Sequence, residues 1–69
     1  MIELGPYIKT RPDITGAGLA RSVGITEAYL YRLIGGTANP SPNVLTRLAE
    51  ALGVEAVHLR HDGTVWVDA

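Results

Sequence analysis

The sequence predicts one small domain that is mostly α-helical and ends in a short β-strand. Apolar residues recur at helical spacing in consecutive segments, and glycine or proline separates these segments. The segment "TVWVD" near the end instead has the β-branched and aromatic content of a strand. Because 69 residues suffice for only one hydrophobic core, we expect a single domain with one main site.

The composition is that of a folded globular protein, with 46% hydrophobic and 19% charged residues. The chain has no cysteine, which excludes a disulfide framework and a thiolate metal site. No apolar run approaches the roughly 20 residues that cross a bilayer, and the first residues lack the pattern of a signal peptide. We therefore expect a cytoplasmic protein that does not enter the membrane.

The first predicted helix covers residues 4–11. Leu4 and Ile8 lie one turn apart on it, so both can face the core. Pro6 is tolerated because it falls in the first turn, where its missing N–H has no helical partner. Pro12 ends this helix, since proline disfavours helical geometry in the residue before it.

The stretch "LARSVGITEAYLYRLIGG", residues 19–36, predicts two short helices joined by a tight turn. Thr15 is a suitable N-cap for a helix over residues 16–23, and Gly24 offers the left-handed conformation that stops it. Thr26 then caps a further helix that covers residues 27–34. The break therefore redirects the chain after a single residue and sets the two helices at an angle.

The helix predicted over residues 27–34 has an apolar side and a free side. At about 100° per residue, Leu30 and Leu33 point the same way and should face the core. The opposite side presents Ala28, Tyr31 and Arg32. A short exposed helix held at an angle on its predecessor suits insertion into the DNA major groove, which is about 12 Å wide.

A strongly amphipathic helix is predicted over residues 42–52, with Ser41 as its N-cap and Gly53 as its stop signal. The pattern of residues 54–59 does not decide between a short fifth helix and a strand. Both alternatives stay open at this point.

The last residues predict a strand that serves dimerisation. Asp62 and Gly63 form a favoured hairpin-turn dipeptide, and the strand that follows cannot stand unpaired. In a homodimer, two such strands would pair antiparallel across the two-fold axis and remove an exposed edge. The residues predicted for this interface are Val65, Trp66 and Val67.

Several segments together show a known family pattern. These are "LGPYIKTR", "LARSVGIT", "LYRLIGG", "NPSPNVLTRLAEALGV" and the closing Leu59. The residues at characteristic spacings within them include Ala20, Gly24, Leu30 and Leu33. In this pattern the chain resembles the Cro/lambda-repressor (XRE) helix-turn-helix superfamily of DNA-binding proteins. The resemblance implies a compact five-helix domain, which we place in residues 1–61. Residues 62–69 then form the C-terminal strand that the residues themselves predict for dimerisation.

The resemblance also implies where DNA would be bound. Base contacts are expected at Thr26, Glu27, Ala28, Tyr29 and Arg32. Phosphate contacts are expected at Thr15, Gly16, Arg21, Tyr31, Thr37, Asn39, Ser41 and Asn43. Backbone N–H groups at helix starts bind phosphate without formal charge, which suits a chain of net charge -1.

Two of these positions have individual arguments. The forked guanidinium of Arg32 can bind O6 and N7 of one guanine together, which makes this side chain the expected base reader. Many family members carry glutamine where this chain has Gly16, so only the backbone is available there. The two tyrosines, Tyr29 and Tyr31, are unusual on one exposed stretch and suggest contact with DNA or with a protein partner.

The sequence thus predicts a non-enzymatic, sequence-specific transcriptional regulator. We expect a repressor of the Cro-like kind found in phages and mobile elements, which binds a palindromic operator as a homodimer. The alternative is an antitoxin or protein-interaction adaptor, with a toxin or other protein as partner and secondary or no DNA binding. No catalytic constellation is recognisable, no cofactor is expected, and His58 and His61 lack the further ligands that a metal site needs.

Overall fold

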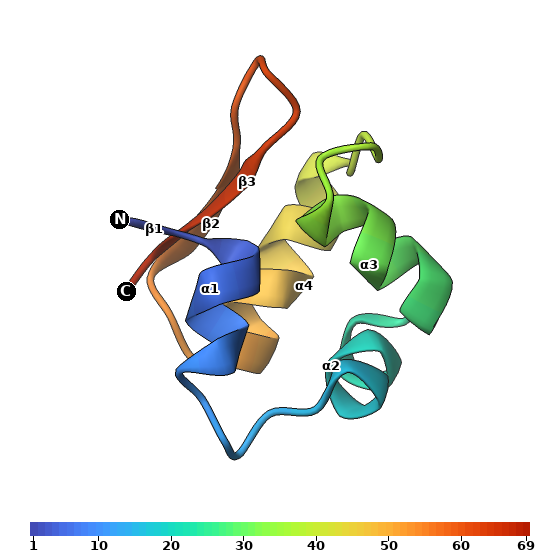
Figure 1. The fold of residues 1–69 in the computed structure, drawn as a ribbon, viewed down its shortest axis with the longest axis vertical. Helices are drawn as coiled ribbons and strands as arrows, with labels where there is room; N and C mark the ends of the chain where they lie inside the picture. Colours follow the sequence, from blue (N-terminus) through green and yellow to red (C-terminus); the bar gives the residue numbers. More distant parts are fainter.

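A computed structural model describes residues 1–69, with the helices packed on one side of a small sheet (Figure 1). The elements in chain order are β1 (Ile2–Glu3), α1 (Leu4–Lys9), α2 (Gly16–Val23), α3 (Glu27–Ile34), α4 (Pro42–Leu52), β2 (Ala56–Leu59) and β3 (Val65–Asp68). The sheet is antiparallel in the order β1-β3-β2. Both chain termini lie at this sheet (Figure 1). None of the helices has the length and apolar character of a membrane span.

The five-helix expectation is wrong, because the chain has four helices and a three-stranded sheet. The segment that was open between helix and strand forms β2, which pairs with β3 in the register Val57 with Val67 and Leu59 with Val65. Pairing supplies the backbone partners that β3 needs. It also turns Val57 into the core, where it is 7% exposed.

The turn between β2 and β3 is fixed by its own polar groups. Gly63 adopts a φ of 91°, and its N–H donates to the carbonyl of Arg60 at 2.9 Å. The carboxylate of Asp62 accepts from the hydroxyl of Thr64 at 2.6 Å and from the N–H of Thr64 at 3.0 Å. These two donors hold the pKa of Asp62 below its ordinary value. The turn expected at Asp62 and Gly63 is therefore present.

The expected dimer contact through β3 must be corrected. β3 is the central strand, because β1 pairs with it on the side opposite β2, Ile2 with Val67. Val65 and Val67 are 2% and 0% exposed in the core of one molecule. Trp66 lies on the other face of the sheet, where the guanidinium of Arg60 stacks 4.0 Å from the centre of its ring. β3 is therefore paired on both sides at Trp66 and Val67, and its two valines are already buried within one molecule, while Trp66 is half-buried.

One hydrophobic core joins the helices to the sheet. Its largest fully buried side chains are Leu4, Leu30, Leu33, Leu48, Leu52, Val23 and Val67. Helix α4 packs against both α2 and β2, so it occupies the centre of the fold. At the start of α1, Gly5 lies so close to α3 that an added methyl group would be 2.9 Å from Cγ2 of Ile34. Helix α3 is thus anchored along its whole inner side.

The helix boundaries follow their capping residues. The hydroxyls of Thr15, Thr26 and Ser41 each accept a hydrogen bond from an N–H in the first turn of the helix they precede. Helices α2, α3 and α4 therefore occupy the ranges that the sequence predicts. Helix α1 ends at Lys9, two residues before the predicted end, and the Thr10 hydroxyl donates to the carbonyl of Tyr7.

Candidate nucleic-acid interface

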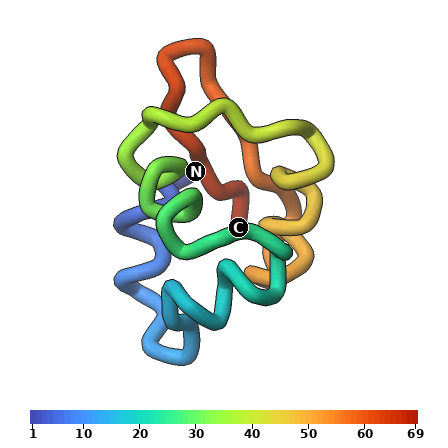
Figure 2. Tube along the Cα trace, turned by 90° about the vertical axis from the view of Figure 1, so that its right-hand side faces the viewer, coloured from blue at the N-terminus to red at the C-terminus, as the bar shows by residue number.

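Helices α2 and α3 are joined by a tight turn that is held on both sides. Gly24 has a φ of 84°, and its N–H donates to the carbonyl of Ala20 at 2.9 Å. The N–H of Ile25 donates to the same carbonyl at 3.0 Å. From α4, Nη1 of Arg47 reaches the carbonyl of Val23 at 3.4 Å. In Figure 2 the two helices lie toward the viewer, on the side of the domain away from the termini in Figure 1.

Helix α3 is divided sharply into a buried and an exposed side. Leu30 and Leu33 are both 0% exposed. Ala28 and Arg32 face the solvent, and Tyr31 is 58% exposed. The orientation expected for this helix is therefore present in the fold, with its leucines inside and these three side chains outside.

Tyr29 differs from that expectation, because it is half-buried and packs against the core. It precedes Leu33 by four residues and so lies beside the apolar stripe of the helix rather than opposite it. Tyr31 alone is the exposed aromatic residue of α3. Of the predicted base contacts, Thr26, Glu27, Ala28 and Arg32 are exposed together at the start and outer side of this helix.

The residues predicted to contact phosphate lie at the ends of helices and in the loop before α4. The exposed ones are Thr15, Arg21, Tyr31, Thr37, Asn39, Ser41 and Asn43, whereas Gly16 is half-buried. The Thr37 hydroxyl donates to the carbonyl of Arg32 at 3.3 Å and so closes the end of α3. The oxygens of Thr15 and Ser41 accept capping bonds, which leaves their hydroxyl hydrogens available to a phosphate.

Arg11 is bound within the chain. Its Nε and Nη2 donate to the two carboxylate oxygens of Asp13, and its Nη1 donates to the hydroxyl of Tyr7 and the carbonyl of Leu52. The hydrogen bonds to Asp13 and Tyr7 raise the pKa of Arg11, and the guanidinium holds the pKa of Asp13 below its ordinary value. These contacts use four of its five N–H donors, so Arg11 fixes the end of α1 to α4.

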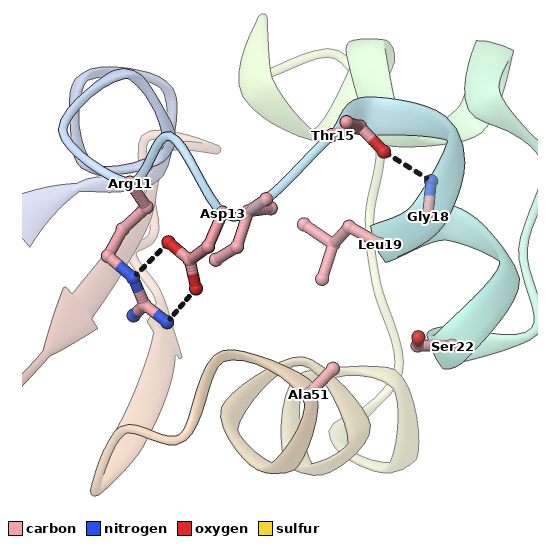
Figure 3. A pocket seen from close by; sticks show the side chains of 8 residues that line it. Arg11, Asp13, Thr15, Gly18, Leu19, Ser22 and Ala51 are labelled. Atoms are coloured by element: carbon pink, nitrogen blue, oxygen red, sulfur yellow. Dashed lines mark hydrogen bonds and ion pairs between the residues drawn. The ribbon is translucent and has the colours of Figure 1, made fainter.

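A hollow of about 280 Å³ lies between the loop after α1, helix α2 and the end of α4 (Figure 3). Most of its polar lining is already paired, because Arg11 holds Asp13 and Thr15 caps the N–H of Gly18 (Figure 3). Arg21 and Arg32, by contrast, take part in neither of the two ion pairs of the chain. Few arginine side chains are therefore free to bind an anion near the exposed side of α3. Hydroxyl and backbone N–H groups would have to supply most of the contacts to such an anion.

Helix α3 has one buried side and one exposed side, and a tight turn joins it to α2. This is the arrangement of a helix-turn-helix. A family model described as a helix-turn-helix domain matches residues 8–61. The chain belongs to the helix-turn-helix domain family. This membership agrees with the resemblance to the Cro/lambda-repressor superfamily and supports DNA as a partner of the chain. Comparisons with curated proteins and with solved structures gave no match.

The helix-turn-helix domain contains two contacts that sequence reasoning missed. Arg47, which the sequence presents as one of several surface cations, caps the end of α2 from α4. Gly63 at the hairpin turn lies against Gly36, so an added methyl group would be 2.8 Å from the Gly36 carbonyl oxygen. The only sequence signal for the second contact is the presence of glycine at both positions. The first contact supports the turn between α2 and α3, and the second supports the chain just after α3.

Proposed function

We propose that this chain is a sequence-specific transcriptional regulator that inserts α3 into the major groove of DNA. The observation that supports this function is the exposed side of α3, where Ala28 and Arg32 face solvent while Leu30 and Leu33 are fully buried. Arg32 reads a guanine, and the smaller residues at the helix start admit the base edges. By occupying promoter DNA, the protein acts as a repressor.

The remaining exposed polar groups position this helix on the sugar-phosphate backbone. The residues proposed to contact phosphate are Thr15, Gly16, Arg21, Tyr31, Thr37, Asn39, Ser41 and Asn43. They come from the start and the last turn of α2, from α3, from the loop and cap before α4, and from the first turn of α4. Neutral donors dominate this set, so the dependence of DNA affinity on salt should be modest for a protein of this class.

Arg32→Ala and Arg21→Ala test the two roles separately. After selection of bound sites from random duplexes, we expect Arg32→Ala to relax the preference at one base position by about 1 to 3 kcal/mol. Arg21→Ala should instead weaken all sequences alike and reduce the salt slope. Affinities are measured by fluorescence anisotropy over a range of salt concentrations. A wild-type chain without saturable DNA binding at low salt would contradict the proposal and favour a protein-interaction adaptor, such as an antitoxin.

We further propose that the regulator binds a palindromic operator as a homodimer through the free edge of β2. Arg60 donates to Thr64 across the hairpin, so the alternation of an antiparallel pair turns the backbone groups of Val57 and Leu59 outward. An open groove of about 300 Å³ between α4 and this edge is lined by Leu45, Ala49 and Val57, among others. An antiparallel second copy would satisfy the outward backbone groups.

Charge supports the same pairing. Two antiparallel copies centred on His58 place Glu55 of one opposite His61 of the other and Arg60 opposite Ala56, so no two carboxylates and no two guanidinium groups face each other. The two helices that read DNA would then occupy half-sites about 34 Å apart. The resulting sheet would continue through both molecules without a free β2 edge.

His58→Lys tests this interface. Within one chain the lysine keeps a partner in Asp68, whose carboxylate lies 3.9 Å from Nε2 of His58. In the dimer, however, it would face the same lysine of the second copy across the two-fold axis, and the two positive charges would repel each other. We expect sedimentation equilibrium to show a shift from dimer to monomer at neutral pH. His61→Lys, at the exposed hairpin turn, is the matched control and should leave the dimer intact. An equal dimer fraction in both variants would exclude this edge as the interface.

A further inference from the structure

The exposed tyrosine of α3 crosses to the first residue of α2. An added methyl group at Gly16 would lie 2.8 Å from Oη and 3.4 Å from Cζ of Tyr31. It would also lie 3.9 Å from a carboxylate oxygen of Glu27, which precedes Tyr31 by one turn. The hydroxyl end of Tyr31 therefore lies in the space that a side chain at position 16 would occupy.

This contact explains two unfavourable features of the sequence together. Glycine costs up to about 1 kcal/mol relative to alanine in a helix, less in a first turn, yet α2 begins with it. Tyr31, 58% exposed, is the second feature, because it and Met1 are the two large hydrophobic residues that the fold leaves exposed. The absence of a side chain at Gly16 provides the surface on which Tyr31 rests.

The hydroxyl of Tyr31 takes part in no hydrogen bond of the chain, whereas the neighbouring hydroxyls of Thr15 and Thr26 are engaged as helix caps. It lies beside the first residue of α2, which the proposed function places at the DNA backbone. A phenol hydroxyl both donates and accepts, and it carries no charge near neutral pH. It can therefore donate to a phosphate oxygen without releasing a counterion of its own.

We propose that Gly16 and Tyr31 act as one unit, in which the missing side chain of Gly16 positions Tyr31 to give DNA a neutral phosphate contact. The inference rests on the proposed function and adds to it a positioning residue, Gly16, and the group with which Tyr31 contacts phosphate, its hydroxyl. Because a phosphate contact is independent of sequence, the unit contributes to affinity and not to base preference.

Tyr31→Phe tests the contact with DNA, since it removes the hydroxyl and keeps the ring on Gly16. We expect affinity for the selected operator and for unrelated duplexes to fall by the same factor, about 2- to 10-fold, the value of one hydrogen bond. The slope of log affinity against log salt and the melting temperature should not change, whereas Arg21→Ala should reduce that slope. Unchanged affinity in Tyr31→Phe, or a loss confined to one base position, would overturn the proposal.

A double-mutant cycle tests the positioning without any DNA. Alanine favours a helix more than glycine does, so Gly16→Ala should raise the melting temperature in a Tyr31→Ala background. In the wild-type chain the gain should be smaller, because the added methyl group has to displace the Tyr31 hydroxyl. Equal effects in the two backgrounds would refute the coupling. If the effects differ while no variant and no wild-type protein binds DNA, the contact stands and the proposed function fails.

Discussion

Leu30→Ala lowers the free energy of unfolding by about 2 to 5 kcal/mol, the range for removing a fully buried leucine side chain. Leu30 is 0% exposed and forms part of the core beneath the exposed side of α3. The loss combines the transfer free energy of the deleted atoms with the cavity they leave. Because small domains are typically stable by only about 5 kcal/mol or somewhat more, a loss at the upper end of this range would leave a substantial fraction of the variant unfolded. Urea unfolding followed by circular dichroism measures the change.

Leu45→Ala is the matched control for Leu30→Ala. Both changes remove the same atoms from a helix, but Leu45 is only half-buried and lines the groove beside β2. Its loss should therefore be clearly smaller. Equal losses in the two variants would show that α3 is not held by Leu30, and the proposed orientation of its outer side would lose its physical basis.

Gly63→Ala is expected to destabilise the domain by about 2 to 5 kcal/mol, from two costs that add. The φ of 91° disfavours any residue with a Cβ, which costs roughly 1 to 2 kcal/mol. The methyl group would also lie 2.8 Å from the carbonyl oxygen of Gly36, a backbone atom that cannot rotate away, and overpacking of this kind costs about 1 to 3 kcal/mol. The hairpin turn should consequently separate from the loop that follows α3.

Gly53→Ala is the control that carries the conformational cost without the steric one. Gly53 has a φ of 69° with no atom within 4 Å of the added methyl group, so only the conformational cost of about 1 to 2 kcal/mol applies. The difference between the two variants in urea unfolding measures the contact between the hairpin turn and Gly36. A loss at Gly63 no greater than that at Gly53 would mean that this contact adds nothing to stability.

Much of the candidate site was predictable because its determinants are local. Thr15, Thr26 and Ser41 mark helix starts through hydrogen bonds to N–H groups three residues later, so short segments of sequence suffice to place α2, α3 and α4. The outer side of α3 follows in the same way from helical periodicity, since Leu30 and Leu33 define its inner side.

The contacts of single side chains were harder to predict. A tyrosine side chain such as that of Tyr29 can either pack on the core or face the solvent. Which of the two it does depends on where the neighbouring helices lie. Arg11 looks like a surface cation in the sequence, but its main partners include the carbonyl of Leu52, 41 residues away. The contact of Gly16 with Tyr31 likewise depends on the angle between two helices, which no local pattern encodes.

The sequence by itself determined one domain with a helix-turn-helix unit, the ends of its main helices and the side of α3 that faces solvent. Only the tertiary structure decided that residues 56–59 form a strand, that β3 lies at the centre of the sheet, and that β2 lies at an edge. The physical reason is that helical hydrogen bonds close within four residues along the chain, whereas a strand obtains its partners from distant segments such as Ile2 and Val67.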